Sequence, residues 1–233
     1  MAVARANPSS PTKVSEILDQ LRTEIVRGRL APGEKLRLEH LAPRFGSGRT
    51  PLREACCRLV AEGLVTSEDQ RGFRVAEISR ADLIDITQTR QHIEPMALRL
   101  AIQRGDAAWE AEVTAALHRL ERAGSPSLPV KGKSSTAKLS DTWEQEHARF
   151  HATLVSACGS PILLRYHAQL FEQSERYRRL AVSHGQPGRD IHGEHTALVK
   201  AALKRDQERA VALLVEHIAA TAERVLAAYP ALV

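Results

Sequence analysis

The sequence predicts a mainly α-helical protein of two domains, and three observations support this. The 233 residues are enough for two modest hydrophobic cores. Only 4% of the residues are aromatic, while Ala, Leu and Arg are abundant, which favours helices over sheets. Residues 1–76 hold 13 Lys and Arg against 9 Asp and Glu, whereas the remainder holds 20 against 19. A basic N-terminal domain therefore precedes a nearly neutral one, and a polyanion is the expected partner of the first.

Composition also restricts the compartment. Three cysteines cannot build a disulfide framework, and Cys56 and Cys57 are neighbours on one predicted helix, so a reducing environment is expected. The sequence has no run of about 18 apolar residues and no charged leader followed by an apolar stretch. We therefore expect a cytoplasmic protein without a membrane span or signal peptide. Residues 1–12 are expected to form a flexible tail.

The N-terminal domain is expected to span residues 13–77. Apolar residues recur every three or four positions over residues 13–29, which predicts a first helix. A turn is expected at residues 31–36, and residues 38–45 predict a second, short helix. After the third helix, residues 66–75 alternate between polar and apolar, as in a small hairpin. Three helices and a hairpin in this order describe a winged helix-turn-helix.

The third helix is expected from about Pro51 to Glu62, where Thr50 can cap it and Gly63 can end it. Its apolar stripe leaves Arg49 and Arg53 near the open side of its N-terminal end. A helix that begins with arginines suits the major groove of DNA. The alternative is an ordinary amphipathic helix whose charges are solvated.

This domain resembles a known family. The matching elements are Pro32-Gly33 with Leu36, Leu41-Ala42, Gly46, the stretch from Arg49 to Ala55, Arg58-Leu59, the stretch from Glu62 to Val65, and Arg71 to Phe73 with Val75. Together they resemble the DNA-binding domain of GntR-family transcription regulators. The resemblance implies that the first arginines of the third helix and the glycine at the wing tip contact DNA. The candidate DNA-binding residues are Arg49, Thr50, Arg53, Arg71 and Gly72. The sequence departs from the family at Gly48, usually serine, and at Cys56, usually leucine and expected here in the core.

The C-terminal domain is expected to be an all-helical bundle over residues 79–229. Ser79 can cap a long helix that runs to about Arg104, and residues 124–135 are expected to form a polar connection rich in Pro, Gly and Ser. Its inward stripe includes Arg90 and Glu94, and a buried guanidinium must be paired. Two interpretations stay open: a simple Arg90–Glu94 pair within the helix, or an Arg90 that binds a carboxylate ligand in a bidentate manner.

Histidines carry most of the chemistry of this domain. His147 and His151 are four residues apart and share an apolar helical face, so they can bind one ligand together. His195 and His217 lie on the inward stripes of two later helices. Each of them alone would be an ordinary core histidine, but four inward histidines on three helices predict a divalent metal site. Imidazole ligands favour transition metals, with zinc or nickel the expected ion.

This region also resembles a known domain. Arg90 and Glu94, Phe150-His151 with Leu154, Ala157 to Pro161, Glu194-His195, Asp206, Ala210 and Glu216 to Ile218 are similar to the FCD effector domain of the FadR branch of GntR regulators. Many such domains hold a metal with one aspartate and three histidines, which implies His151, His195 and His217 here. The aspartate position is His147. The site therefore has either four imidazoles, or three with His147 nearby in another role.

Four neutral imidazoles leave the charge of a divalent metal uncompensated, so the site should attract an anion. We expect a small carboxylate effector, a dicarboxylate or hydroxy acid, held by the metal and by Arg90 and Glu94. The stretch 173–180 adds Arg176, Tyr177 or Arg178, of which Arg176 and Tyr177 are the retained candidates.

The leading hypothesis is a dimeric, ligand-responsive transcription regulator, expected to be a repressor that binds a palindromic operator. The alternative is a metal-dependent hydrolase that uses Glu144, Glu146 or Glu194 as base, although no glutamate lies in a His-Glu-x-x-His motif. In a third interpretation the metal is itself the signal, or a permanent structural ion.

Overall fold

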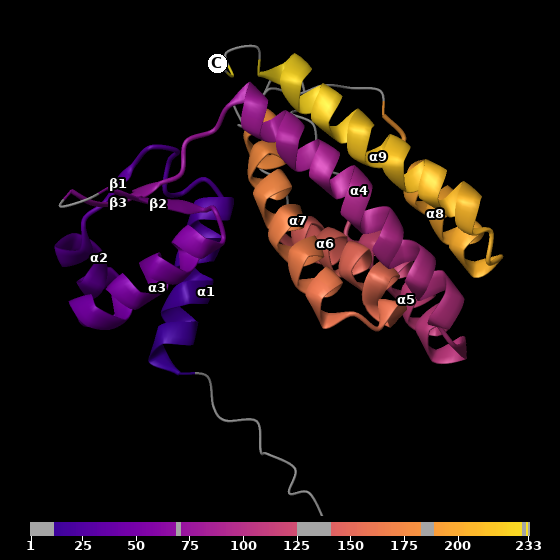
Figure 1. Cartoon of the computed structure of the whole chain (residues 1–233), viewed down its shortest axis with the longest axis horizontal. Coiled ribbons are helices and arrows are strands. Elements are labelled where there is room, and N and C mark those ends of the chain that lie inside the picture. Colours follow the sequence, from indigo (N-terminus) through magenta and orange to yellow (C-terminus); the bar gives the residue numbers. More distant parts are fainter. Residues whose placement is uncertain (1–11, 69–70, 125–140, 183–188, 230–231, 233) are drawn as a thin grey trace, which may run out of the picture. The chain divides into compact units, whose positions relative to one another are not determined.

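The computed structural model describes residues 12–68, 71–124, 141–182, 189–229 and 232. The chain divides into two compact units, residues 1–77 and 78–233. Helices pack around a small sheet in the first unit, and the second unit is a bundle of helices (Figure 1). Within the described ranges, no helix is long and apolar enough to cross a membrane.

The first unit contains α1 (Lys13–Val26), α2 (Leu38–Arg44) and α3 (Arg49–Ala61), with β1 (Lys35–Leu36), β2 (Val65–Glu68) and β3 (Gly72–Val75). The strands pair in the antiparallel order β1-β3-β2. The core of this unit is formed by apolar residues from all three helices and the sheet, among them Ile17, Leu52, Leu59 and Phe73. The winged helix-turn-helix predicted from the sequence is confirmed.

Two local predictions in this unit were wrong. Residues 35 and 36 were expected in a turn, but they pair with Arg74 and Phe73 of β3, because a third strand buries Leu36. Thr50 does not cap α3: the helix begins at Arg49, and the capping position is Gly48, which has no side chain to donate or accept. Thr50 is an exposed residue of the first turn.

The second unit contains α4 (Arg80–Arg104), α5 (Ala107–Arg122), α6 (Asp141–Val155), a short 3₁₀ helix η1 (Ser156–Cys158), α7 (Pro161–Val182), α8 (Ile191–Leu203) and α9 (Gln207–Ala228). The long helix α4 packs against α6, α7 and α9 (Figure 1). Ser79 caps it as predicted, since its hydroxyl accepts a hydrogen bond from the Asp82 amide at 3.1 Å. Helix α6 begins beyond the polar connection expected at residues 124–135, which lies outside the described residues except for Gly124.

Two apolar clusters fill the second unit, and α4 contributes to both. Leu83 and Ile86 belong to a small cluster near its N-terminal end, while Ala97 and Ala101 belong to the larger cluster. The inward stripe predicted for α4 is buried along its whole length, including Arg90 between the two clusters. The polar side chains between the clusters form the candidate site.

Candidate metal centre and DNA-binding face

Four histidines from three helices meet inside the second unit. His147 and His151 lie one turn apart on α6, His195 lies on α8 and His217 on α9, and all four are buried. One ring nitrogen of each lies within 4.8 Å of those of the other three. The Nε2 atoms of His147 and His151 are 3.1 Å apart, and two nitrogens on one tetrahedral zinc ion are separated by about 3.3 Å. The spacing therefore fits a single ion.

Unsatisfied polar atoms also fit a metal. Nε2 of His195 is buried without a hydrogen-bond partner among the described residues, which is costly unless another group binds it. Nδ1 of His147 is also buried without one, on the side of the ring away from the Nε2 atom that faces His151. Burial lowers the pKa of His147, His151 and His195 well below the ordinary value, and neighbouring cations act in the same direction. Burial also lowers the pKa of His217. Neutral imidazoles are the form that binds metal.

Three arginines surround the histidines, and each is paired with glutamate. Nε of Arg90 donates to Glu94 at 2.5 Å, and Nη1 donates to the Ser174 hydroxyl at 2.8 Å. The other two pairs are Arg178 with Glu144 and Glu175, and Arg189 with Glu194. Because each guanidinium has a carboxylate partner, these side chains leave the charge of a bound divalent metal uncompensated.

The pKa values of the glutamates show how strongly these pairs interact. Burial alone would raise the pKa of Glu94, but the Arg90 guanidinium and His167 lower it to about 2. Burial raises the pKa of Glu144 to about 8, against the pull of Arg178 and with the help of the Glu175 carboxylate. Burial alone would raise the pKa of Glu175, but Arg178, a hydrogen bond with Glu144 and Arg179 together lower it to about 2. The two carboxyl groups therefore share one proton near neutral pH.

The cavity beside the histidines is very small. Its volume of about 10 Å³ has room for a single water molecule. Residues from α4, α6, α7 and α9 line it: Arg90, His147, His151, Phe171, Ser174, Glu175, Arg178, His217 and Thr221. Ser174, Glu175 and Arg178 were missing from the predicted site. Their spacing of three, four and seven residues after Phe171 places them on one helical face and is the signal that could have identified them.

Three effector candidates do not line this cavity. Glu94 lies behind Arg90 as its partner, which supports the interpretation of a pair within the helix. Arg176 is buried but does not contribute to the wall. Tyr177 belongs to the small apolar cluster, where its hydroxyl donates to Asp82 at 2.6 Å and accepts from the Ser79 amide at 3.1 Å. Arg176 and Tyr177 do not line this cavity, because α7 directs Ser174 and Arg178 toward it instead, and their part in effector binding stays a prediction.

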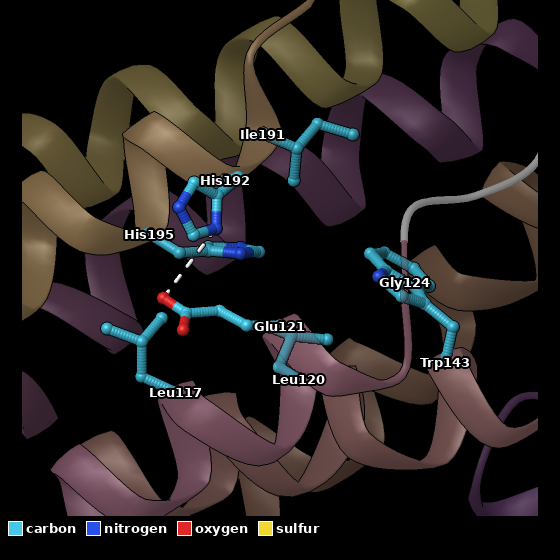
Figure 2. Close-up of a pocket in the computed structure, with 8 residues that line it drawn as sticks. All are labelled: Leu117, Leu120, Glu121, Gly124, Trp143, Ile191, His192 and His195. Atoms are coloured by element: carbon cyan, nitrogen blue, oxygen red, sulfur yellow. Dashed lines mark ion pairs between the residues drawn. The ribbon is translucent and has the colours of Figure 1, made fainter.

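A second, larger pocket lies behind His195. It has a volume of about 120 Å³ and lies between α5, α6 and α8, lined by apolar side chains and by Trp143 (Figure 2). His192 and Glu121 form an ion pair at its rim, with 3.7 Å between Nδ1 and Oε1. The His192 side chain is 61% exposed, so this histidine is not part of the cluster.

The candidate DNA-binding residues lie on one side of the first unit. Arg49 and Arg53 of α3, Arg71 before β3 and Gly72 at its start line one hollow of about 430 Å³. The three arginines are exposed. Gly72 has φ of 92°, a conformation that glycine adopts without strain. Lys35 and Arg37 line the same hollow but were not predicted, because Lys35 lies in a strand that was expected to be a turn and Arg37 lies directly before α2.

Comparisons with known proteins agree with this architecture. Residues 13–75 match the model of the bacterial regulatory proteins of the gntR family, and residues 85–220 match the FCD domain. The chain is 40% identical over 219 residues to the uncharacterized HTH-type transcriptional regulator BphR of Paraburkholderia xenovorans, covering 92% of this chain and 87% of that protein. It is 39% identical over 202 residues to the HTH-type transcriptional repressor GlaR of Escherichia coli, covering 85% and 89%. The solved structure of E. coli McbR/YncC has the same fold, with a TM-score of 0.77 at 22% identity over 94% of this chain and 99% of that one.

Proposed function

The chain belongs to the GntR family of bacterial regulatory proteins, in the group that carries an FCD domain, and we propose that a small carboxylate controls it through a metal bound by four histidines. It is a transcription regulator and not an enzyme. The hydrolase hypothesis is therefore wrong. Of its three candidate bases, Glu144 and Glu194 are engaged by arginines, and Glu146 lies near Arg119.

The convergence of four neutral imidazoles is the observation that carries this proposal. His147, His151, His195 and His217 would hold zinc or nickel, both of which accept imidazole ligands. The surrounding arginines are balanced by glutamates, so the centre keeps the charge of the ion. An anion is the ligand that this charge selects, and a dicarboxylate or hydroxy acid can bind the metal with one group and Arg90 with another.

Arg90 can accept such a ligand without losing Glu94. A guanidinium has five N–H donors, and the bonds of Arg90 to Glu94 and Ser174 involve three of its N–H groups. The closed cavity holds no more than a water molecule, so a carboxylate must enlarge it. Helix α7 forms one wall through Ser174 and Arg178, and its displacement is the change that the effector would stabilise.

The same helix reaches the start of the second unit. Tyr177, next to Arg178, holds Asp82 and the Ser79 amide at the N-terminal end of α4. The first unit ends at Glu77, two residues before Ser79. A shift of α7 would therefore change the position or freedom of the segment that leads to the DNA-binding unit, which is the coupling that allosteric control requires.

DNA binding is proposed through α3 and the wing of a homodimer. Arg49, Thr50 and Arg53 would contact the major groove, and Arg71 and Gly72 the backbone. Two-fold symmetry would match a palindromic operator. We propose repression that the effector relieves, in keeping with the repressor name of the E. coli relative.

Two measurements test this proposal together. Purified protein should contain about one zinc or nickel ion per chain, and the H151A and H217A variants should lose it. Succinate, malate and citrate should be screened for a rise in melting temperature of the metal-loaded protein, and the active acid should release the DNA upstream of the gene. Wild-type protein that takes up no metal would sink the proposed centre.

The small cavity favours a second candidate, in which the metal itself is the signal. Its closed wall suits an ion better than an organic acid. In that case zinc alone changes DNA binding of the metal-free protein, and none of the acids adds to the effect.

A further inference from the structure

We propose that Glu194 and Glu144 act as positioning residues for two of the four histidines, by holding each imidazole in the tautomer that presents Nε2 to the metal. This inference rests on the proposed metal centre and concerns residues that do not bind the ion themselves. Glu194 acts on His217, and Glu144 acts on His147.

Hydrogen bonds at His217 decide its tautomer. Nδ1 of His217 lies 2.8 Å from Oε2 of Glu194 and 3.1 Å from Nη2 of Arg189. Arginine can only donate a hydrogen bond and the ionised carboxylate can only accept one, so Nδ1 can suit only one of them. Arg189 holds both oxygens of Glu194, which is the two-bond geometry of an ionised carboxylate paired with arginine.

Arg189 does not need Nδ1 as an acceptor. It donates to both carboxylate oxygens of Glu194 at 2.6 and 2.5 Å, to the Thr221 hydroxyl at 2.8 Å and to the His217 carbonyl at 2.9 Å. Arg189 therefore keeps its acceptors when Nδ1 of His217 carries a proton. Without that proton, Nδ1 and the Glu194 oxygen would be two acceptors only 2.8 Å apart. The favoured tautomer has Nδ1–H bonded to Glu194 and a free lone pair on Nε2. This is the form that coordinates a metal.

His147 also needs a hydrogen-bond partner for its Nδ1 atom, but no such bond is formed among the described residues. Its Nε2 faces Nε2 of His151 at 3.1 Å, so Nδ1 is the nitrogen left for an outer partner. Nδ1 of His147 and Oε1 of Glu144 are both buried and without a hydrogen-bond partner among the described residues. A carboxylate oxygen of Glu144 lies within 4.8 Å of a ring nitrogen of His147, one helical turn later. A hydrogen bond between these two atoms would satisfy both.

Glu144 and Glu194 would orient the histidine rings without cancelling the positive charge of the metal. Arg189 balances the charge of Glu194, and Arg178 balances the single negative charge that Glu144 and Glu175 share, so the two residues add no net negative charge. They raise the affinity for metal by removing the wrong tautomers before the ion arrives. The charge that attracts a carboxylate effector stays in place.

Zinc affinity of E194Q and E144Q tests this inference, measured by competition with a chromogenic chelator. Outer-sphere partners of metal-bound histidines contribute about 10- to 100-fold in affinity, and we expect at least about a 10-fold loss in each variant. E121Q is the matched control, because Glu121 also faces a histidine of α8, but His192 lies outside the cluster (Figure 2). We expect its zinc affinity to stay within about twofold of the wild type.

The tautomer of His217 can be read directly in the metal-free wild type, so the test does not depend on the folding of a variant. Long-range ¹H–¹⁵N spectra at neutral pH should show the proton on Nδ1, with H217N assigning the signal. A proton on Nε2 instead, or unchanged zinc affinity in both glutamine variants, would overturn the inference. A wild type that binds no zinc but shows the Nδ1–H tautomer would refute the proposed function and not the hydrogen bond.

Discussion

Replacing His147 by aspartate tests the charge argument for the effector. The change exchanges a neutral ligand for a negative one at a position whose ring nitrogen lies within 4.8 Å of the other three ligand atoms. A carboxylate effector on the same ion would therefore lie about 5 Å from the new carboxylate. Two like charges at about 5 Å repel by about 3 kcal/mol at an effective dielectric constant of about 20, which corresponds to more than 100-fold in affinity.

Relaxation of the cavity reduces this figure, so we expect H147D to weaken effector binding by at least about 10-fold while keeping or strengthening metal binding. H147N is the matched control, because asparagine has the shape of aspartate without its charge. Titration calorimetry of the zinc-loaded proteins should use whichever of succinate, malate and citrate stabilises the wild type most. If H147D retains zinc and binds that acid as tightly as H147N does, uncompensated charge is not what selects the ligand.

Three further predictions follow from other contacts. R53A should weaken operator binding by about 10- to 100-fold and flatten its salt dependence, whereas R58A, whose guanidinium pairs with Glu54 on the exposed side of α3, should stay within about twofold in the same gel-shift titration. Y177F should cost about 1 kcal/mol of unfolding free energy in urea, because it removes the hydroxyl that bonds Asp82 and Ser79, and Y166F, at an exposed tyrosine of the same helix, should cost nothing. Metal-free protein should lose stability as the pH falls below about 6.5, because the unfolded histidines take up protons there while the folded ones, with lowered pKa, do not. Glu144, with its pKa raised to about 8, releases one proton on unfolding in this range, whereas the three histidines take up three. The net uptake of two protons lowers the free energy of unfolding by about 3 kcal/mol per pH unit, which thermal or urea unfolding can measure.

Patterns between residues close together in the sequence were sufficient to predict most of the fold. Helical periodicity and capping residues such as Ser79 placed the long helices, because both signals arise between residues three or four apart. The errors came where local signals were weak. A two-residue strand such as Lys35–Leu36 has no periodicity of its own, and it forms only because β3 offers it a partner. Thr50 has the chemistry of a cap, but the helix begins one residue before it.

The sequence by itself determined which histidines point inward, since His147, His151, His195 and His217 each share a helical face with apolar neighbours. Tertiary structure alone decided that these faces meet within 4.8 Å, that Arg178 and not Tyr177 lines the cavity, and that Glu194 reaches His217. The physical reason is the distance along the chain over which each signal acts. Periodicity records which face of a helix avoids water, whereas the partner of a buried charge is chosen by packing between helices, and the two partners can be 23 to 84 residues apart in the chain.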